Sequence, residues 1–238
     1  MKIKQNSLCI MGLIALGYLN PSCLMANNKK NNKSSEDTVF KIEEFGIPFT
    51  EDLMREHGIL NRLLLIYDEI IKRIDTKQEF PISTLSRSAD IIKSFIEDYH
   101  EKLEEDYVFP LFEAQKKEVK LVKTLRDQHK KGRVITTQLQ ELATAGTPNA
   151  ATKKTIKNLL KKFITMYRPH EARENTVLFP LVRSLISEEK FKELSAFFDK
   201  TEEERFGEHG FEKTLNQVVV IEKELGIYAL EKFTPKTD

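Results

Sequence analysis

The chain has 238 residues, enough for one sizeable domain with additional segments; 40% of them are hydrophobic and 32% are charged. This balance is typical of a soluble globular protein and excludes a chain that is disordered throughout. Lysine and arginine (38) nearly equal aspartate and glutamate (37), so the strong basic field of a nucleic-acid-binding protein is missing and we expect no nucleic-acid partner. Glycine is sparse, at 9 residues, which favours helices.

Residues 1–26 have the layout of a secretory signal peptide. Two lysines near the N-terminus precede an apolar run over residues 8–19, which is too short to be a permanent membrane anchor. Small or neutral residues follow up to Ala26. The pattern predicts cleavage after Ala26 and a bacterial protein exported to the periplasm or the cell exterior, with no stable transmembrane span.

Two alternatives stay open for this segment. Cys23 follows Ser22, as a lipid-modified cysteine would, so the chain could be a lipoprotein anchored at Cys23. The segment could also be an apolar helix of an uncleaved cytoplasmic protein. Both cysteines, Cys9 and Cys23, precede Ala26, so a mature chain cut there would have no thiol and would hold any metal by imidazole and carboxylate groups.

The remaining chain is expected to form one linker and one folded domain. Residues 27–38 are polar and lack periodicity, which predicts a flexible linker before a domain over 39–238. Helical spacing of apolar residues predicts four long helices and two shorter ones, over 50–75, 82–115, 117–144, 150–186, 187–205 and 208–225. Thr50 is expected to cap the first helix and Pro110 to kink the second. The pattern predicts an all-α protein, an up-down-up-down four-helix bundle with two shorter C-terminal helices.

One motif occurs twice at identical spacing, in the second and the fourth predicted helix. The pattern H-E-x-x-E-x-x-x-x-F-P-L begins at His100 and again at His170. A lone histidine on the preceding helix comes before each copy, His57 before the first and His129 before the second. We therefore expect two helical hairpins built on the same plan.

The spacing within the motif is suited to metal binding. His100 and Glu104 stand four residues apart, as do His170 and Glu174, and such positions share one helix face. Two related hairpins would bring both pairs to the bundle centre, where the lone histidines join them. Carboxylates can bridge two metals while imidazoles take terminal positions. Nitrogen and oxygen ligands without sulfur suit iron, with manganese or zinc possible.

A single H-x-x-x-E pair is more often a solvated ion pair than a metal site. Here four of the five histidines of the chain fall in the duplicated register, which favours a ligand role for the set. The apolar residues next to the motif are interpreted as core residues with no other role: Leu103, Phe109, Leu178 and Phe179.

The order H…HExxE…H…HExxE, over about residues 50–185, resembles the hemerythrin-like, or HHE cation-binding, domain. The resemblance implies a four-helix bundle with two non-haem iron ions. Carried over, the terminal ligands would be His57, His100, His129 and His170, and the bridging ligands Glu104 and Glu174. Glu101 and Glu171 are weaker candidates, since the glutamate at this place joins the metal shell in some iron-sensing members and would otherwise be a supporting or surface carboxylate.

One position departs from the oxygen carriers that this plan resembles. Those proteins hold a second histidine four residues after the first on the third helix, where this chain has Arg133. His209, in the C-terminal extension, could supply the missing nitrogen, or it could be an exposed histidine. The departure puts reversible oxygen carriage in doubt. The chain also lacks the cysteine-bearing N-terminal domain of the iron–sulfur repair members, so that role is not expected.

The sequence therefore supports two alternative functions. The first is a binding protein whose di-iron centre binds or senses iron, dioxygen, peroxide or nitric oxide. The second is a di-iron enzyme with catalase-like, peroxidase-like or oxidase activity. No organic-substrate pocket is specified by the sequence, which slightly favours binding, so the expected partner is a small diatomic or peroxide ligand. The ligand repeat disfavours a purely structural bundle.

Overall fold

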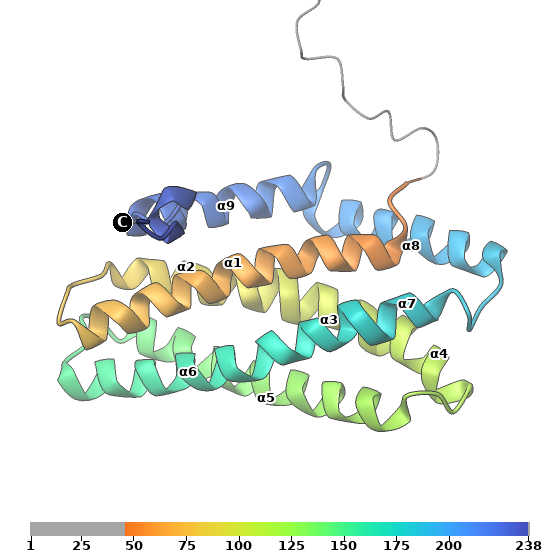
Figure 1. Ribbon diagram of the computed structural model, residues 1–238, viewed down its shortest axis with the longest axis horizontal. Coiled ribbons are helices and arrows are strands. Elements are labelled where there is room, and N and C mark those ends of the chain that lie inside the picture. Colours follow the sequence, from red (N-terminus) through yellow and green to blue (C-terminus); the bar gives the residue numbers. More distant parts are fainter. Residues whose placement is uncertain (1–45, 238) are drawn as a thin grey trace, which may run out of the picture. The chain divides into compact units, whose positions relative to one another are not determined.

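The computed structural model describes residues 46–237, and in this part of the chain all regular structure is helical (Figure 1). The all-α fold expected from the sequence is confirmed. The predicted signal peptide, the linker over 27–38 and the expected domain start at Val39 lie outside the described residues. Within 46–237 no helix combines the length and the apolar character that a membrane crossing requires.

Four long arms form an up-down-up-down bundle in the described part of the chain (Figure 1). The first arm is α1 (Phe49–Asp75), and the third is α5 (Val119–Thr144). The second arm comprises α2 (Ile82–Ile91), η1 (Ile92–His100), α3 (Glu101–Leu103), η2 (Glu104–Val108) and α4 (Phe109–Ala114). The fourth comprises α6 (Ala150–Arg173), η3 (Glu174–Leu178) and α7 (Phe179–Val182). Helix α1 packs against α6, and α2 packs against α5.

The arm ends differ in detail from the sequence-based expectation. Helix α1 begins at Phe49 after Pro48, so Thr50 is its second residue and the expected Thr50 cap is wrong. The Phe49 N–H is instead satisfied by the Ser195 hydroxyl, at 3.2 Å, on a helix distant in sequence. The fourth arm ends at Val182 rather than near residue 186.

The prolines of the repeat directly follow wide turns. Segments η2 and η3 are π-helical, and in each the N–H of the motif phenylalanine donates to the carbonyl of the motif glutamate five residues earlier. A proline follows that phenylalanine, and its ring would clash with the carbonyl four residues before it in a regular α-helix. The wider turn accommodates the proline, and a π-turn that begins at Glu104 lies where the kink at Pro110 is expected.

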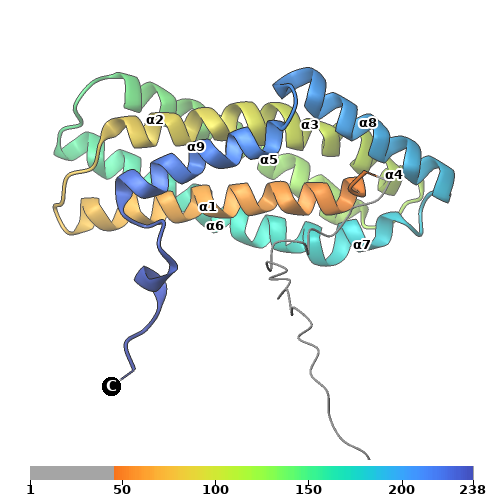
Figure 2. The same cartoon turned by 90° about the horizontal axis from the view of Figure 1, so that it is seen from above.

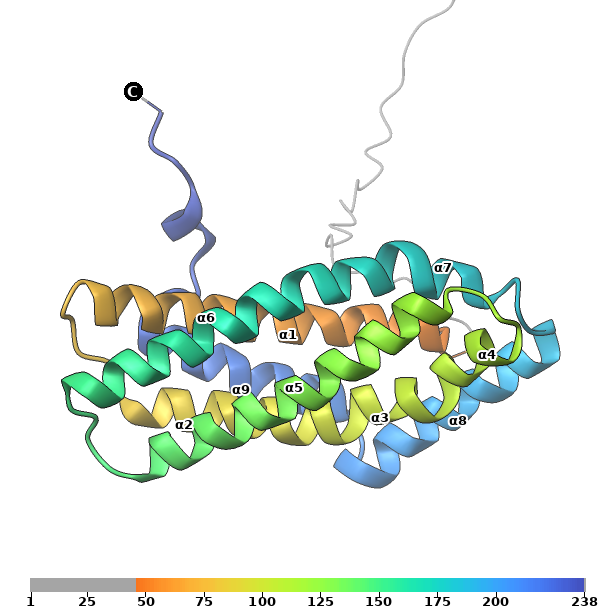
Figure 3. The ribbon, with the colours of Figure 1, turned by 90° about the horizontal axis from the view of Figure 1, so that it is seen from below.

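Two further helices cover one side of the bundle. They are α8 (Glu188–Phe206) and α9 (Gly210–Leu225), followed by the short η4 (Leu230–Phe233). Helix α9 lies along α1 and α2 (Figure 2), while α5 and α6 form the opposite face (Figure 3). Phe49 packs its ring against Phe191 and Phe198 of α8, at centroid distances of 4.8 and 4.9 Å. Arg62 of α1 pairs with Glu222 of α9, at 2.8 Å from Nε to Oε1.

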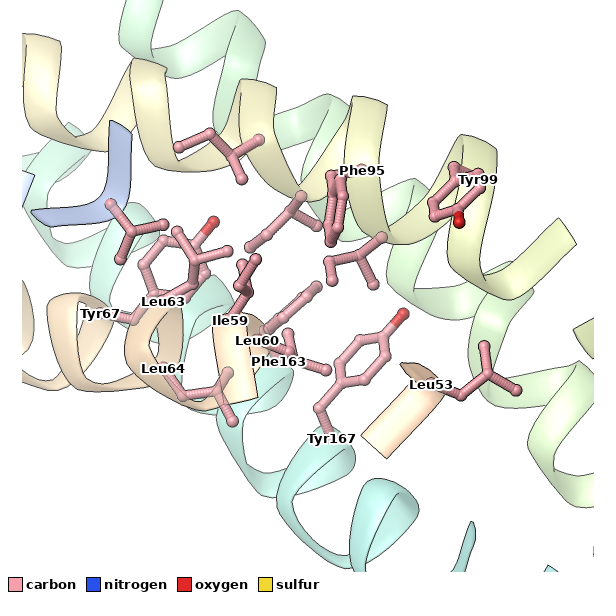
Figure 4. Packing of buried hydrophobic residues seen from close by; sticks show 14 of the residues in the cluster. Leu53, Ile59, Leu60, Leu63, Leu64, Tyr67, Phe95, Tyr99, Phe163 and Tyr167 are labelled. Atoms are coloured by element: carbon pink, nitrogen blue, oxygen red, sulfur yellow. The ribbon is translucent and has the colours of Figure 1, made fainter. Parts of the chain in front are cut away.

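The bundle interior is filled by buried aromatic and aliphatic side chains (Figure 4). Phe163 lies between Tyr67 and Tyr167, at centroid distances of 5.6 and 4.3 Å. On α1, Leu53 and Leu60 stand four residues before and three after His57, on the same buried face. The hydrophobic face that stabilises the bundle therefore also delivers the histidine to its centre.

Candidate metal centre

Two pairs of histidines face each other inside the bundle. Nε2 of His57 on α1 lies 3.1 Å from Nε2 of His100 at the end of η1. Nε2 of His129 on α5 lies 3.1 Å from Nε2 of His170 on α6. All four side chains are buried. Each pair joins the lone histidine and the motif histidine of one hairpin, which is the convergence that the spacing predicts.

The two motif glutamates connect these pairs. Glu174 Oε2 lies 3.4 Å from Nε2 of His57 and 3.1 Å from Nε2 of His170. Glu104 Oε2 has the same relation to the other two histidines, at 3.6 and 3.5 Å. Each carboxylate thus spans one imidazole from each pair. Both are fully buried, and their oxygens have no hydrogen-bond partner among the described residues.

The other ring nitrogen of every histidine faces an oxygen acceptor. The contacts of Nδ1 are His57 with Asn175 Oδ1 (2.8 Å), His100 with Glu56 Oε2 (2.6 Å), His129 with Glu105 Oε1 (3.0 Å) and His170 with Gln128 Oε1 (2.9 Å). An acceptor keeps the proton on Nδ1, so the Nε2 lone pair points to the centre. Two facing lone pairs repel at 3.1 Å unless a proton or a metal cation lies between them.

Burial opposes a proton at two of these nitrogens. Burial and the neighbouring His57 lower the pKa of His100 well below its usual value. Burial lowers the pKa of His129 to about 4, in spite of its hydrogen bond to Glu105. For His57, burial acts to lower the pKa, but the contact with Glu174 outweighs it and the pKa is raised. The neutral, metal-binding form is thus favoured at His100 and His129 at neutral pH.

The two connecting glutamates have pKa values shifted in opposite directions. Burial and the charge of Glu174 raise the pKa of Glu104 well above its usual value. Burial also disfavours charge on Glu174, but the adjacent His170 and His57 outweigh it and lower that pKa. A cation between the carboxylates would supply the missing positive charge. The facing imidazoles and the unpartnered oxygens of both glutamates therefore fit a pair of metal cations.

The two motif phenylalanines do more than fill the core. Phe179 stacks on His57 and Phe109 stacks on His129, each at a centroid distance of 5.6 Å, with interplanar angles of 20° and 23°. These rings restrict rotation of the two lone imidazoles. The interpretation of Phe109 and Phe179 as core residues without another role is therefore incomplete, because their stacking orients two members of the centre.

Glu101 is buried, but its oxygens contact protein groups. The Tyr167 hydroxyl donates to Glu101 Oε1 at 2.6 Å, and Arg133 Nη2 lies 2.9 Å from Glu101 Oε2. Arg133 also donates to Glu105 at 2.8 Å. Burial raises the pKa of Glu101 to about 8 although Tyr167 and Arg133 act to lower it. Arg133 thus turns inward and binds two carboxylates at the position where oxygen carriers have an imidazole.

Glu171 holds the equivalent place in the other hairpin. It is buried, and the Asn61 side-chain amide donates to its Oε2 at 2.8 Å. Burial raises the pKa of Glu171 to about 7, partly offset by His57. Asn61 follows His57 by four residues, as Arg133 follows His129. The two halves therefore hold the glutamate after the motif histidine in the same way, with different side chains.

His209 lies apart from this group. It stands at the start of α9 with φ of 61°, is exposed, and lines a surface pocket together with Glu202. The four imidazoles at the centre are those of the duplicated register, and His209 adds no fifth.

Four residues that contact the histidines were not singled out from the sequence: Glu56, Glu105, Gln128 and Asn175. A signal for them exists in the repeat. Glu56 and Gln128 directly precede the lone histidines, and Glu105 and Asn175 directly follow the motif glutamates. A polar residue at the same offset in both copies marks the place of a hydrogen-bond acceptor.

A buried set of imidazoles and carboxylates inside a four-arm bundle defines a cation-binding helical protein. The family model described as hemerythrin HHE cation binding domain matches residues 49–206, and the chain belongs to this family. The matched range contains both histidine pairs, both connecting glutamates and α8, and it ends before α9.

Relatives of the chain occur in mycobacteria. An uncharacterized protein of Mycobacterium bovis and uncharacterized proteins of two Mycobacterium tuberculosis strains are each 41% identical to it over 222 residues. The alignments cover 93% of this chain and 87% of each relative. No solved structure matches the chain.

Proposed function

We propose that the chain holds two iron ions at this centre and uses them to bind or sense a small ligand: iron itself, dioxygen, peroxide or nitric oxide. His57 and His100 would be terminal ligands of one ion, and His129 and His170 of the other. Glu104 and Glu174 would bridge. The proposal rests on one observation. The oxygens of Glu104 and of Glu174 have no hydrogen-bond partner among the described residues, and each glutamate lies between one imidazole of the first histidine pair and one of the second.

The choice of iron follows from the donor set. Four imidazole nitrogens and two carboxylates, without sulfur, suit iron, while manganese and zinc are the competing metals. A paired iron centre, when loaded, supplies one-electron steps and an open position for an oxygen-containing or diatomic ligand. The protein supplies the Nδ1 acceptors that orient the rings and the phenylalanines that stack on two of them.

Metal content tests the proposal directly. Protein from iron-replete cells should contain about two iron atoms per chain, as in other paired carboxylate sites. His129→Gln should reduce that number, whereas His209→Gln, which changes an exposed histidine outside the centre, should leave it unchanged. Recovery of metal-free protein or of one zinc per chain from the same cells would contradict the di-iron assignment.

Redox turnover is the second candidate function, as a di-iron enzyme that decomposes peroxide or oxidises a small reductant. The hydrogen-bonded series Tyr167, Glu101 and Arg133 favours it, because ionisable groups lie next to two of the histidines. Tyr167 packs against His170 at a centroid distance of 5.4 Å, and Arg133 donates to Glu105, the partner of His129. Arginine has no lone pair to give, so Arg133 leaves one ion with fewer nitrogen ligands than an oxygen carrier has.

Rapid mixing of reduced, iron-loaded protein with oxygen distinguishes reversible oxygen carriage from redox turnover. We expect the protein to end in the ferric state, and peroxide to be consumed catalytically if the enzyme function holds. An oxygen complex that is long-lived and releases oxygen under vacuum would instead show a carrier.

We also propose that the chain is exported, because residues 1–26 combine basic residues, an apolar run and small residues in signal-peptide order. Intact mass and cell fractionation test this. Simple cleavage gives a chain beginning at Asn27, and the lipoprotein route gives a lipidated Cys23. A full-length cytoplasmic product beginning at Met1 would refute export.

A further inference from the structure

A second group of carboxylates lies near the start of α1, where α8 packs against it. Asp52 and Glu56 of α1 and Glu202 of α8 each offer an oxygen, and these oxygens lie within 4.8 Å of one another. Asp52 is 4% exposed and Glu56 is 1% exposed. Oxygen ligands at about 2.0–2.6 Å from one hard cation are at most about 5 Å apart, so a single cation can contact all three residues.

Two of these carboxylates each have one oxygen engaged by the protein. Asp52 Oδ1 accepts from Arg55 at 3.0 Å, and Glu202 Oε1 accepts from the Phe211 backbone N–H at 2.8 Å. Both contacts hold the side chain in place and leave its second oxygen for another partner. Arg55 is the positive charge that faces the group, and it pairs outward with Glu212 as well, at 3.7 Å.

A buried oxygen of Glu56 without a hydrogen-bond partner is independent evidence for a ligand at this group. Its Oε2 accepts from His100 Nδ1, at 2.6 Å, while its Oε1 is fully buried and has no hydrogen-bond partner in the described part of the chain. The Tyr99 hydroxyl lies near this carboxylate and acts to lower its pKa, but no hydrogen bond of normal geometry joins the two groups. An ionised oxygen deprived of water and of donors is costly in a protein interior, and a bound cation removes that cost.

An acidic surface pocket lined by residues of α8 and α9 adjoins the group through Glu202. The pocket has a volume of about 530 Å³, and Glu202 belongs both to its lining and to the buried group. Its lining includes the acidic residues Asp199, Glu202, Glu203, Glu208 and Glu212, with Arg55 and His209 beside them. A recess lined mainly by one sign of charge raises the local concentration of counter-ions.

We propose that Asp52, Glu56 and Glu202 form a third cation site, which takes hard divalent cations from the acidic pocket and delivers them towards the dinuclear centre. Oxygen-only ligands suit Fe²⁺, Mn²⁺, Mg²⁺ or Ca²⁺ rather than thiophilic metals. Glu56 belongs to the third site through one oxygen and holds His100 through the other. The same carboxylate therefore stands between the cation coming from the pocket and a ligand of the centre. The delivery role rests on the proposed di-iron function, whereas the site itself does not.

Manganese stoichiometry tests the site on the full chain. Metal-free protein dialysed against Mn²⁺ should bind three ions per chain, and Glu202→Gln should bind two. Glu203→Gln removes the same charge from the same pocket but lies outside the buried group, so it should retain three. Asp52→Asn provides a second variant, and the helical circular dichroism of each variant shows that it is folded.

The loading rate tests delivery. Bound iron is measured after timed anaerobic incubation with low Fe²⁺ and desalting. We expect Glu202→Gln to load about 10-fold more slowly than wild type, because it removes a ligand of the third site in addition to one charge of the pocket. Glu203→Gln should load within about 2-fold of wild type.

The outcomes are distinct. Two Mn²⁺ in both wild type and Glu202→Gln would overturn the third site and would mean that the three carboxyls share protons instead. Loss of the third ion without slower loading would overturn delivery. One Mn²⁺ in wild type that Glu202→Gln abolishes would support the third site and refute the dinuclear centre.

Discussion

The two hairpins of the bundle agree in the residues that face the centre and differ in the residues behind them. His57, His100 and Glu104 are matched in type by His129, His170 and Glu174. The equivalent supporting positions are Glu56 and Gln128, Asn61 and Arg133, and Glu105 and Asn175. The duplication therefore keeps the donor set while the hydrogen-bond partners vary.

Each of the two histidine pairs has one carboxylate and one amide as hydrogen-bond partners. In the first pair, His100 faces the Glu56 carboxylate and His57 faces the Asn175 amide. In the second pair, one histidine again faces a carboxylate, Glu105, and the other an amide. A carboxylate partner makes an imidazole a stronger donor to a metal than an amide does. Each histidine pair thus contains one imidazole with a carboxylate partner and one with an amide partner.

The largest loss of bound iron is expected when one of the two glutamates between the histidine pairs is replaced. Glu104→Ala or Glu174→Ala removes a ligand from both ions, so each variant should retain little iron. Glu101→Ala and Glu171→Ala change carboxylates that contact Tyr167 or Asn61 instead, and should lower iron affinity only about 10–100-fold. Metal analysis after dialysis against a chelator measures both. Equal losses in the two sets would refute the bridging roles.

Substitution of one glycine from each hairpin by alanine should change the stability of the protein in opposite directions. A Cβ at Gly132 would lie 2.0 Å from the Tyr167 hydroxyl oxygen, whereas a Cβ at Gly58 meets nothing within 4 Å. Gly132→Ala should lower the free energy of unfolding by about 2 kcal/mol, because the buried tyrosine must move from Glu101. Gly58→Ala should raise it by about 1 kcal/mol through helix propensity. Urea denaturation gives both values, and a stabilised Gly132→Ala would show that the Tyr167 contact is dispensable.

A smaller effect is expected from exchanging the acceptors behind one histidine of each pair. Glu105→Gln should weaken the second metal position about 10-fold, since His129 then loses its carboxylate partner. Asn175→Asp should strengthen the first position, because His57 then gains one. Stepwise iron release to a chelator separates the two ions. Unchanged release in both variants would mean that the acceptors do not tune the metals.

The smallest expected effect is a pH-dependent change in the free energy of unfolding. Burial, with Glu202 nearby, raises the pKa of Asp52 from about 3.8 to about 6. The folded chain holds this proton more tightly than the unfolded chain, so ionisation of Asp52 costs nothing below pH 3.8 and its full penalty above pH 6. In metal-free protein, Asp52→Asn should therefore raise the free energy of unfolding by about 1 kcal/mol at pH 8 and leave it unchanged near pH 3.5.

Urea titrations at the two pH values, with the exposed Glu203→Gln as control, check this expectation. Addition of Mn²⁺ at pH 8 should cancel the advantage of the Asp52→Asn variant, because the wild-type carboxylate then has a cation. A gain of equal size at both pH values would show that Asp52 ionisation is not its cause.

The bundle and the convergence of the histidines could be predicted because both depend on short-range spacing. Positions four residues apart share a helix face, and the repeat copies that relation, so His170 and Glu174 meet as His100 and Glu104 do. The π-turns could not be seen, because apolar periodicity averages over one added residue. The group of Asp52, Glu56 and Glu202 was also missed, since Glu202 joins it only through the packing of α8 on α1.

The π-turns after Glu104 and Glu174 have a consequence for changes in chain length. One residue added to an α-helix turns everything downstream by about 100°, unless a wider turn absorbs it. In η2 and η3 it is absorbed locally, and Phe112 and Val182 beyond them are still buried. Loss of one residue inside either segment would keep the downstream faces inward but would press the motif proline against the carbonyl four residues before it. The same loss within α5 before His129 would rotate the residues after it, His129 included, relative to those before it. The extra residue of each π-turn is thus tied to the proline that follows it, because a shorter arm would keep its faces and lose the room for the proline ring.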